Sequence, residues 1–402
     1  MVSAGENHTV LLRSDGIAVA CGANHDGQCN FPRLDDGMLY TKVSAGSYHS
    51  ILLRSDGIAV ACGMNKHGQC NIPCLEDGMT YTQVSAGGSH TVLLRSDGIA
   101  VACGNPAHGR NIPSLDDTMT YTQVSAGQSH TVLLRSDGIA VACGENTHGQ
   151  CNIPCLEDGM TYTQVSAGDF HTVLLRSDGV AVACGLSTHG ACHFPRLEDG
   201  MRYTQVSAGA NFTVLLRSDG IAVARGLNVQ GQCNIPRLDD GITYTQVLTG
   251  RFHSVLLRSD GGAVACGMNN HGQCKMVTPD PGTWYVADAE LCGDIVVQLD
   301  FACQDDAMLL TCSDLTGEAV VCLSTAPREL AWGIHKRIAR ELKLPLQRLR
   351  VVLPDGQLLA SVCRANPGAS LADVATRGLR VELELDQKSR GHGGDPPKII
   401  SK

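Results

Sequence analysis

Two sets of regularly spaced histidines are the residues of this chain best placed to do chemistry. One set recurs about every 41 residues at His8, His49, His90, His130, His171 and His253, and Phe212 occupies the sixth place. A looser set follows at His67, His108, His148, His189 and His271. Histidines bind a metal when several converge on one ion, but equivalent residues of adjacent repeats are separated by a sheet spacing of about 10 Å. We therefore predict hydrogen-bonding histidines, with Phe212 as a packing substitute, and we expect no metal and no cofactor.

Cysteines also recur in two sets, which could face each other across a hairpin. The first set is Cys21, Cys62, Cys103, Cys143, Cys184 and Cys266, and the second is Cys29, Cys70, Cys151, Cys192, Cys233 and Cys274. The third repeat keeps Cys103 but has no second cysteine, and the sixth keeps Cys233 but has Arg225 in the first position. Because each cysteine does without its supposed partner, we predict buried, reduced thiols; the alternative is structural disulfides or zinc.

No catalytic constellation stands out. Serine, histidine and aspartate occur in every repeat, whereas a catalytic triad needs one site with three distinct roles. The chain also lacks a phosphate-binding loop motif. We predict that the protein is not an enzyme and has no catalytic residues.

Charge is distributed unevenly along the chain. Residues 1 to 306 contain 17 basic and 30 acidic side chains, and residues 307 to 402 contain 14 basic and 10 acidic ones. The phosphate backbone of nucleic acid repels an acidic surface, so nucleic-acid binding by the first part is unlikely. An arginine precedes each Ser-Asp-Gly turn, as at Arg95, and we expect these arginines to pair with the neighbouring aspartates or with solvent.

The repeat itself determines the expected fold. The phrase Val-Ser-Ala-Gly-x-x-His-Thr-Val-Leu-Leu-Arg-Ser-Asp-Gly recurs, with small changes, from Val2, Val43, Val84, Val124, Val165, Val206 and Val247. In one unit, residues 81–86, 90–95 and 99–103 have the pattern of strands, a Gly-Gln-Cys-Asn-Ile segment is a candidate fourth strand, and Asp97-Gly98 is typical of a hairpin turn. The third strand is small and apolar on both faces, which favours burial between sheets. We predict a mainly β protein with a seven-bladed β-propeller.

Both ends of the repeat region contribute to ring closure in this scheme. The first unit lacks the Asp-Gly-Met-x-Tyr-Thr segment that leads into later units, and Tyr285 follows Tyr244 by one period. We predict that residues 282–286 supply the missing strand of the first blade. A truncated gene product is the alternative.

A second, smaller domain is expected after the propeller. Residues 307–312 and 318–323 have the pattern of a hairpin, Leu330, Ile334, Ile338 and Leu342 that of an amphipathic helix, and residues 349–353 and 379–385 that of further strands. With its Leu-Thr-Gly hairpin, this order resembles the ubiquitin fold. We predict a propeller over 1–288, a connecting segment over 289–306 with a possible bridging strand at 299–303, a small α+β ubiquitin-like (β-grasp) domain over 307–386, and a disordered tail over 387–402.

The repeat resembles that of the regulator of chromosome condensation family, in a compact form. The likeness lies in Ala-Gly-x-x-His-Thr (86–91), Leu-Leu-x-Ser-Asp-Gly (93–98), Cys-Gly-x-Asn (62–65) and Gly-Gln-Cys-Asn (68–71). The family often has Trp-Gly where this chain has Cys-Gly. The resemblance implies a propeller and, as one function, promotion of nucleotide exchange on a small GTPase.

We favour a non-enzymatic protein-protein interaction scaffold, with the exchange regulator and an accessory of a HERC-type ubiquitin ligase as alternatives. We expect a protein partner, with a small GTPase and a ubiquitin-pathway protein as the candidates, and neither a membrane nor nucleic acid. Candidate partner-binding residues break the repeat or match the apolar patch of ubiquitin: Arg110, Phe170, Phe212, Arg225, Arg251, Val351, Leu353 and Leu359. With no secretory signal pattern and 19 cysteines, we expect a cytoplasmic or nuclear location.

Overall fold

The computed structural model describes residues 1–278 except 36, 110, 117, 199 and 240, then Tyr285 and the backbone of four strands between 295 and 352. The chain divides into two compact units, Met1–Cys292 and Gly293–Lys402. In the described residues, no helix is long and apolar enough to span a bilayer.

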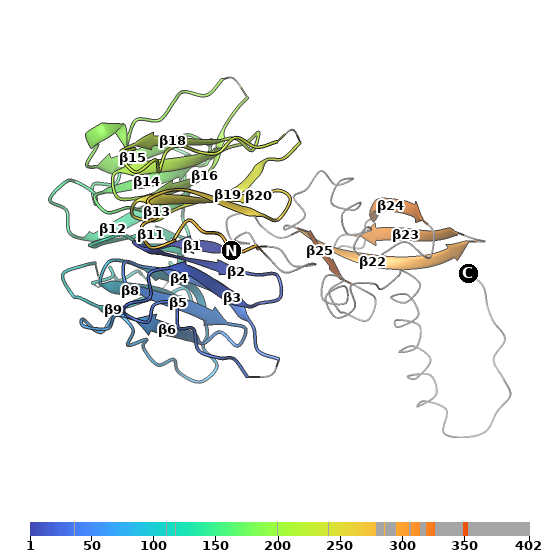
Figure 1. The fold of residues 1–402 in the computed structure, drawn as a ribbon, viewed down its shortest axis with the longest axis horizontal. Helices are drawn as coiled ribbons and strands as arrows, with labels where there is room; N and C mark the ends of the chain where they lie inside the picture. The colour runs from blue at the N-terminus through green and yellow to red at the C-terminus, as the bar shows by residue number, and fades with distance from the viewer. Residues whose placement is uncertain are drawn as a thin grey trace. The chain divides into compact units, whose positions relative to one another are not determined.

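The first unit consists of seven antiparallel sheets of three strands each, one sheet per repeat (Figure 1). The first strands are β1 (Val2–Ala4), β4 (Tyr40–Ala45), β7 (Tyr81–Ala86), β10 (Tyr121–Ala126), β13 (Tyr162–Ala167), β16 (Tyr203–Ala208) and β19 (Tyr244–Thr249). The second strands are β2 (His8–Leu12), β5 (His49–Arg54), β8 (His90–Arg95), β11 (His130–Arg135), β14 (His171–Arg176), β17 (Phe212–Arg217) and β20 (His253–Arg258). The third strands are β3 (Ala18–Gly22), β6 (Ala59–Gly63), β9 (Ala100–Gly104), β12 (Ala140–Gly144), β15 (Ala181–Gly185), β18 (Ala222–Gly226) and β21 (Ala263–Gly267), and a 3-10 turn, η1, spans Thr188–Gly190.

The predicted fourth strand is wrong for the described repeats. In the first repeat, the Asn24 side chain accepts a hydrogen bond from the Cys29 backbone N–H at 2.9 Å and donates to Asn30 at 2.8 Å. Because side chains already satisfy this backbone, the segment folds as a turn and not as a strand. The third strand is therefore the outer edge of each blade and is mostly half-buried, where we expected it to be buried between sheets.

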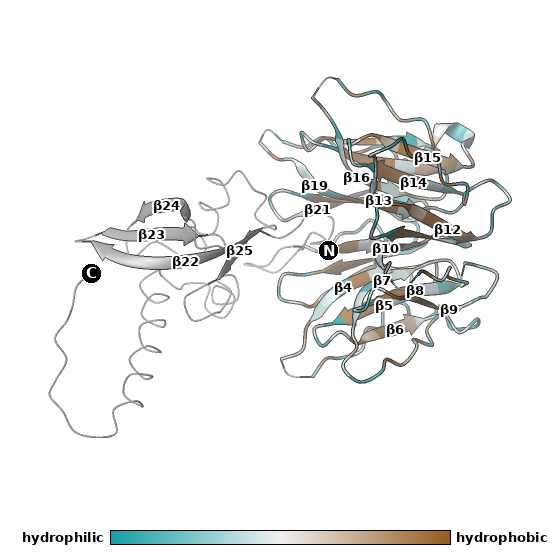
Figure 2. Ribbon diagram, turned by 180° about the vertical axis from the view of Figure 1, so that it is seen from behind, coloured by the Kyte–Doolittle hydropathy of each residue, from teal (hydrophilic) through white to brown (hydrophobic). Residues whose placement is uncertain are grey.

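The strands of the propeller are largely hydrophobic (Figure 2), and alternating side chains of the second strand pack against the two neighbouring blades. In β11, Val132 and Leu134 pack in one cluster with Tyr162, Val165 and Leu174 of the following blade. Leu133, which points the other way, packs with the preceding blade. This alternation makes each blade complementary to both neighbours, so that every repeat depends on the next for its core.

Tyr285 closes the ring. It forms an isolated antiparallel bridge with Arg13, the pairing that Tyr40 makes with Arg54 in the next blade. Its side chain is 1% exposed and packs with Val2, Leu11 and Leu257. The predicted closure is confirmed at Tyr285, while residues 282–284 and 286 of the predicted segment lie outside the described residues.

The second unit contains a four-stranded sheet in the order β24-β23-β22-β25. Its strands are β22 (Ile295–Gln304), β23 (Ala307–Ser313), β24 (Ala319–Thr325) and β25 (Leu349–Val352). β23 and β24 form the predicted hairpin, and β22 pairs antiparallel with β23 and parallel with β25. Residues 295–304, which include the possible bridging strand, are thus part of this sheet; the helix, the last strand and the tail of the predicted ubiquitin-like domain lie outside the described residues.

Candidate functional site at the mouth of the central channel

The turns between first and second strands meet at one end of the propeller. In these turns the residue after Ala-Gly donates its backbone N–H to the next blade, as from Ser47 to the Gly87 oxygen at 3.2 Å. The series continues around the ring and ends with Arg251 donating to the Gly5 oxygen at 3.1 Å. The loops after the third strands reach the same end because the strands are antiparallel. We call this end the channel-mouth face.

Below this face, a ring of histidine hydrogen bonds joins the blades. His49 Nε2 lies 2.9 Å from Thr91 Oγ1 of the next blade, and the Thr91 hydroxyl itself donates to the Gln69 carbonyl. The hydroxyl proton is committed, so Nε2 must be the protonated nitrogen. The same contact, at 2.8–3.0 Å, is made by His8, His90, His130, His171 and His253. The predicted hydrogen-bonding histidines are confirmed, and Phe212 leaves one gap in the ring.

The two residues that follow Ala-Gly differ from blade to blade. They are Glu6-Asn7, Ser47-Tyr48, Gly88-Ser89, Gln128-Ser129, Asp169-Phe170, Ala210-Asn211 and Arg251-Phe252. The first residue of the pair is different in all seven blades, although the residues on either side are nearly constant. The residues that differ from one repeat to the next therefore lie side by side at the channel mouth.

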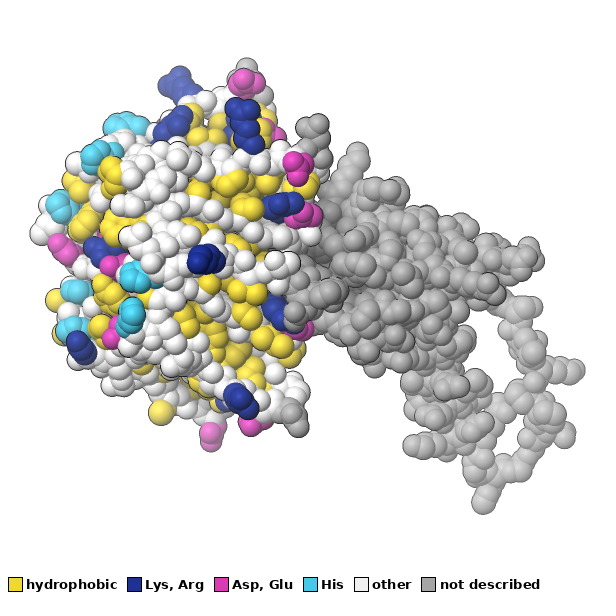
Figure 3. Space-filling model, in the orientation of Figure 1, with side chains coloured by type: hydrophobic (Ala, Val, Ile, Leu, Met, Phe, Trp, Pro, Cys, Tyr) yellow, Lys and Arg dark blue, Asp and Glu magenta, His cyan; other side chains and the backbone are white. Residues whose placement is uncertain are grey.

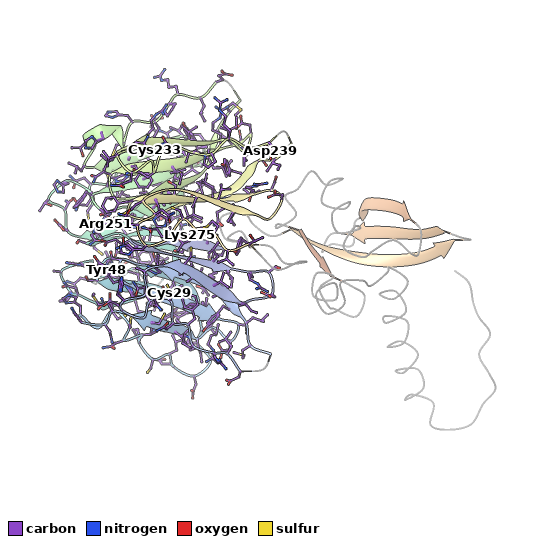
Figure 4. The ribbon with its side chains drawn as sticks, viewed as in Figure 1. Cys29, Tyr48, Cys233, Asp239, Arg251 and Lys275 are labelled. Carbon is purple, nitrogen blue, oxygen red and sulfur yellow. The ribbon has the colours of Figure 1, made fainter. Side chains whose placement is uncertain are left out.

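Arg251 is the centre of a charged cluster at the mouth. Its Nη1 lies 2.9 Å from Glu6 Oε2 and its Nε lies 2.8 Å from Asp169 Oδ2, so one arginine links the seventh, first and fifth blades. The Tyr48 hydroxyl donates to the other Glu6 oxygen at 3.0 Å. Figure 4 labels Arg251 and Tyr48 at this end of the propeller, with Asp239 at the opposite end.

Burial controls the electrostatics of this cluster. The side chains of Glu6 and Asp169 are 11% and 10% exposed. Loss of solvation raises the pKa of Asp169 to about 6, and the nearby Arg251 charge opposes this rise without overcoming it. Burial acts to lower the pKa of Arg251, but the two carboxylates outweigh it and the net shift is upward.

The channel behind the mouth is lined by the first strands and has a cavity of about 230 Å³. Its serines join adjacent blades, as where Ser3 Oγ accepts the Ala45 N–H at 2.9 Å. Across the mouth, the Ser47 hydroxyl donates to Gln128 Oε1 at 3.0 Å. Polar side chains therefore connect blades that are not neighbours.

Histidines of the looser set surround the mouth. His148 packs edge-on against Phe170 at 5.4 Å between ring centroids, and His25 packs against His271 at 5.9 Å. Figure 3 shows histidines gathered along this face. Among the described residues, no group of three histidine, cysteine or acidic side chains could hold a metal ion.

The structure separates the predicted partner-binding residues. Phe170 and Arg251 lie together at the channel mouth. Phe212 is 0% exposed in the core between blades, so its side chain is removed from the candidate surface residues. Arg225 is exposed on the outer strand β18.

The other four predicted partner-binding residues are placed only in part. Arg110, Leu353 and Leu359 lie outside the described residues, and Val351 is placed in β25 by its backbone alone. Glu6, Tyr48, Gln128 and Asp169 are not among the predicted residues. The signal that identifies them is that the two residues after Ala-Gly differ from blade to blade while the residues on either side are nearly constant.

The fourteen described cysteines are free. Both sets donate to backbone carbonyls, as from Cys62 Sγ to Gln28 at 3.4 Å and from Cys70 Sγ to Met64 at 3.3 Å. Burial raises the pKa of Cys62 to about 12 and that of Cys70 to about 11, so both thiols are protonated at neutral pH. The described cysteines are thus unpaired, in agreement with the predicted thiols, but the prediction of burial is wrong for most of them: they are half-buried, and only Cys103 is buried among those described.

The predicted arginine–aspartate pairs are also present. The arginine that ends each second strand pairs with the aspartate two residues later, in Arg13–Asp15, Arg54–Asp56, Arg95–Asp97, Arg135–Asp137, Arg176–Asp178, Arg217–Asp219 and Arg258–Asp260. They lie at the end of the propeller opposite the channel mouth.

Comparison with solved structures supports this fold. Prp20p from Saccharomyces cerevisiae aligns with a TM-score of 0.55 and 18% identity over 67% of this chain and 82% of its own. Human WBSCR16 aligns at 0.54 and 19% over 63% and 85%, and the CRINKLY WD40 ectodomain of the Arabidopsis thaliana receptor kinase ACR4 at 0.54 and 17% over 67% and 96%. No curated protein matches the sequence.

A family model covers every blade. It describes the regulator of chromosome condensation (RCC1) repeat and matches residues 2–28, 40–69, 81–110, 121–150, 162–191, 203–232 and 244–273. These segments make up about half of the chain and coincide with the seven sheets. The chain therefore belongs to the family of regulator of chromosome condensation (RCC1) repeat proteins.

Proposed function

We propose that this protein is a non-enzymatic interaction scaffold that binds a protein partner through the channel-mouth face. The observation that carries the proposal is the position of the variable pairs. The core residues of the repeat stay the same, while the position at the channel mouth takes seven different residues, so the sequence varies at this face and preserves the fold. Propellers of near-identical blades offer few other places where a partner could distinguish one orientation from another.

The chemistry of the face suits protein binding. Tyr48, Phe170 and Phe252 are half-buried at this face, and the Arg251 guanidinium lies 5.3 Å from the Phe252 ring centroid. Tyrosine and arginine are enriched at the energetic centres of protein interfaces, and aromatic residues are enriched at interfaces generally. The face therefore combines apolar anchors with a fixed charged group.

A paired substitution tests the proposal. Phe170→Ser with Phe252→Ser gives these turns the serine that Ser89 and Ser129 already provide in two blades, so the fold should be retained. Glu76→Ser with Asp77→Ser on the opposite end is the matched control. Proteins cross-linked to the wild type and to the control should be lost from the channel-mouth variant; their retention by that variant would refute the proposal.

Nucleotide exchange on a small GTPase is the second candidate. Its support is the similarity to Prp20p, whose described binding properties concern Gsp1p and histones. An exchange factor must bind the nucleotide-free GTPase more tightly than the nucleotide-bound form. Under the scaffold proposal we expect no acceleration of labelled GDP release from a panel of small GTPases, and acceleration at substoichiometric protein would favour exchange.

We further propose that residues 307–386 form a ubiquitin-like module that addresses a second partner. The β23–β24 hairpin supports it, and β22, which pairs parallel with β25, extends the same sheet to residues before 307. If this module is present, the alternative to a plain scaffold is an accessory protein of a ubiquitin ligase whose catalytic subunit is a separate protein. The free thiols support a cytoplasmic or nuclear location.

A further inference from the structure

A second cavity lies at the outer edge of the propeller, away from the channel mouth. It has a volume of about 230 Å³ and is formed where the loop leaving the fifth blade crosses the sheet of the sixth. Arg196, Arg217 and Arg225 line it, together with one carboxylate, Glu198. A liquid water molecule occupies about 30 Å³, so the space can hold a small polyatomic ion.

Arg225 adds a third positive charge to this cavity, at a position where the repeat otherwise has a cysteine. In the other six blades this position is a cysteine whose thiol donates to a carbonyl of the preceding blade, as Cys184 does to Gln150 at 3.4 Å. The longer arginine side chain extends to the surface and is exposed. Burial raises the pKa of Tyr203 beside it, while the positive charges of Arg225 and Arg217 act against that rise.

Three arginines outnumber the two described carboxylates at this site, Glu198 and Asp219, so a net positive charge remains. Arg217 pairs with Asp219 at 2.7 Å. Arg225 donates one hydrogen bond, to its neighbour's Ala224 carbonyl, and in the part of the chain that the structure describes neither Arg225 nor Arg196 forms an ion pair. Glu198 lines the cavity but makes no described ion pair with the three arginines. An acidic propeller thus holds a local excess of guanidinium groups.

The second and seventh blades have the same arginine pair as this cavity but no counterpart of Arg225. Arg33 with Arg54, and Arg237 with Arg258, occupy the positions of Arg196 with Arg217, but Cys62 and Cys266 stand where the sixth blade has Arg225. The third arginine therefore distinguishes this cavity from its counterparts. These counterparts serve as internal controls.

We propose that the Arg196–Arg217–Arg225 cavity is an anion site for a phosphoryl group. Guanidinium groups present paired N–H donors that match phosphate oxygens, and a phosphate monoester carries nearly two negative charges and three acceptor oxygens at neutral pH. A singly charged carboxylate offers less of both. This site is separate from the channel mouth, and its occupancy does not depend on the proposed scaffold role.

Inorganic phosphate is the probe, followed by ³¹P line broadening with the full-length protein near neutral pH and at constant ionic strength. Arg225→Cys restores the residue of six blades and should fold normally; it should weaken phosphate binding by about tenfold, the effect of losing one charge-assisted contact. Arg196→Ser, which copies Ser114 of the third blade, should weaken it similarly. Arg237→Ser, the matched change one blade further on, should have no effect.

A second arm identifies the source of the phosphoryl group. Tighter binding of a phosphoserine peptide than of inorganic phosphate, lost in Arg225→Cys, would support recognition of a phosphorylated protein segment. Equal binding of the two would support a site for the free anion. Equal binding of phosphate by wild type and Arg225→Cys, equal weakening by Arg237→Ser, or binding of acetate as tight as that of phosphate would overturn the proposal.

Discussion

At the scale of single residues, the constant and variable positions of the repeat have different physical causes. A side chain on Gly168 would place its Cβ 2.3 Å from the Gly209 oxygen and 2.9 Å from His171 Cε1, so this position must remain glycine. The next residue carries a side chain in six of the seven blades; the exception is Gly88, where a Cβ would lie 2.4 Å from the Gln128 oxygen. The sequence predicted the hydrogen-bonding histidines, but their threonine or serine partners come from the following blade, and a pattern within one repeat could not identify them.

Arg251 provides a prediction at this scale. Arg251→Ala leaves the carboxylates of Glu6 and Asp169 largely buried without their counter-ion, so the free energy of unfolding should fall by about 3 kcal/mol in urea titrations, the lower end for breaking a buried pair. Asp169→Asn in the Arg251→Ala background should recover part of that loss, because it removes one uncompensated charge.

The double substitution also has a pH signature. The folded-state pKa of Asp169, about 6, lies above its ordinary value of 3.8, so Asp169 contributes stability at low pH that is lost as the pH rises toward 6. Asp169→Asn should abolish this contribution. Additive losses in the two single variants and the double variant, with no change in pH dependence, would contradict the coupling.

At the scale of elements, strands were predicted correctly where apolar residues alternate. The prediction was wrong where side-chain hydrogen bonds take the place of backbone pairing between strands. The first three strands of each repeat were predicted within about one residue, because valine and leucine alternate between neighbouring blades. The Gly-Gln-Cys-Asn segment has strand-forming residues at its end, but Asn24 and its equivalents bond to its backbone. The strand propensity of single residues does not include this competition between side-chain and backbone hydrogen bonds.

The closing element gives the second prediction. Tyr285→Ala should lower the free energy of unfolding by about 3 to 5 kcal/mol in urea titrations, because a fully buried aromatic side chain is removed. It should also increase amide hydrogen exchange in β1 and β2, since it detaches the segment that pairs with Arg13. Tyr162→Ala, the same residue inside the continuous fifth blade, is the control.

Tyr162 and Tyr285 have nearly the same burial, at 3% and 1%, so both variants should lose comparable packing energy. The increase in exchange at β1 and β2 should occur for Tyr285→Ala alone. Equal exchange in the two variants would show that Tyr285 fills space without holding the ring closed.

At the scale of the whole molecule, the histidine ring makes the stability of all seven blades depend on pH. Burial lowers the pKa of His8, His130 and His171 to about 4 and that of His49, His90 and His253 to about 3. The ordinary histidine pKa is 6.5. The unfolded chain therefore binds more protons than the folded one between these values, so stability is complete above pH 6.5 and falls as the pH decreases toward 4.

Six such groups correspond to a slope of up to about 8 kcal/mol per pH unit, against a total stability of about 5 to 15 kcal/mol for a typical domain. We expect cooperative acid unfolding near pH 5, well above the point at which most carboxylates are protonated. Circular dichroism during a pH titration, with proton uptake measured in parallel, checks this.

Phe212→His sharpens the test because the site is already prepared for a histidine. Ser254 occupies the acceptor position and donates its hydroxyl to the Gln232 carbonyl, as the threonines do in other blades. Gly209 and Gly226 leave room for the ring there, as their counterparts do in the other blades. The variant should fold at neutral pH, complete the ring, and steepen the pH dependence by about 1.4 kcal/mol per pH unit, the effect of one more proton. An unchanged slope, or wild-type protein that is equally stable at pH 7 and pH 5, would show that the ring is not what couples the fold to pH.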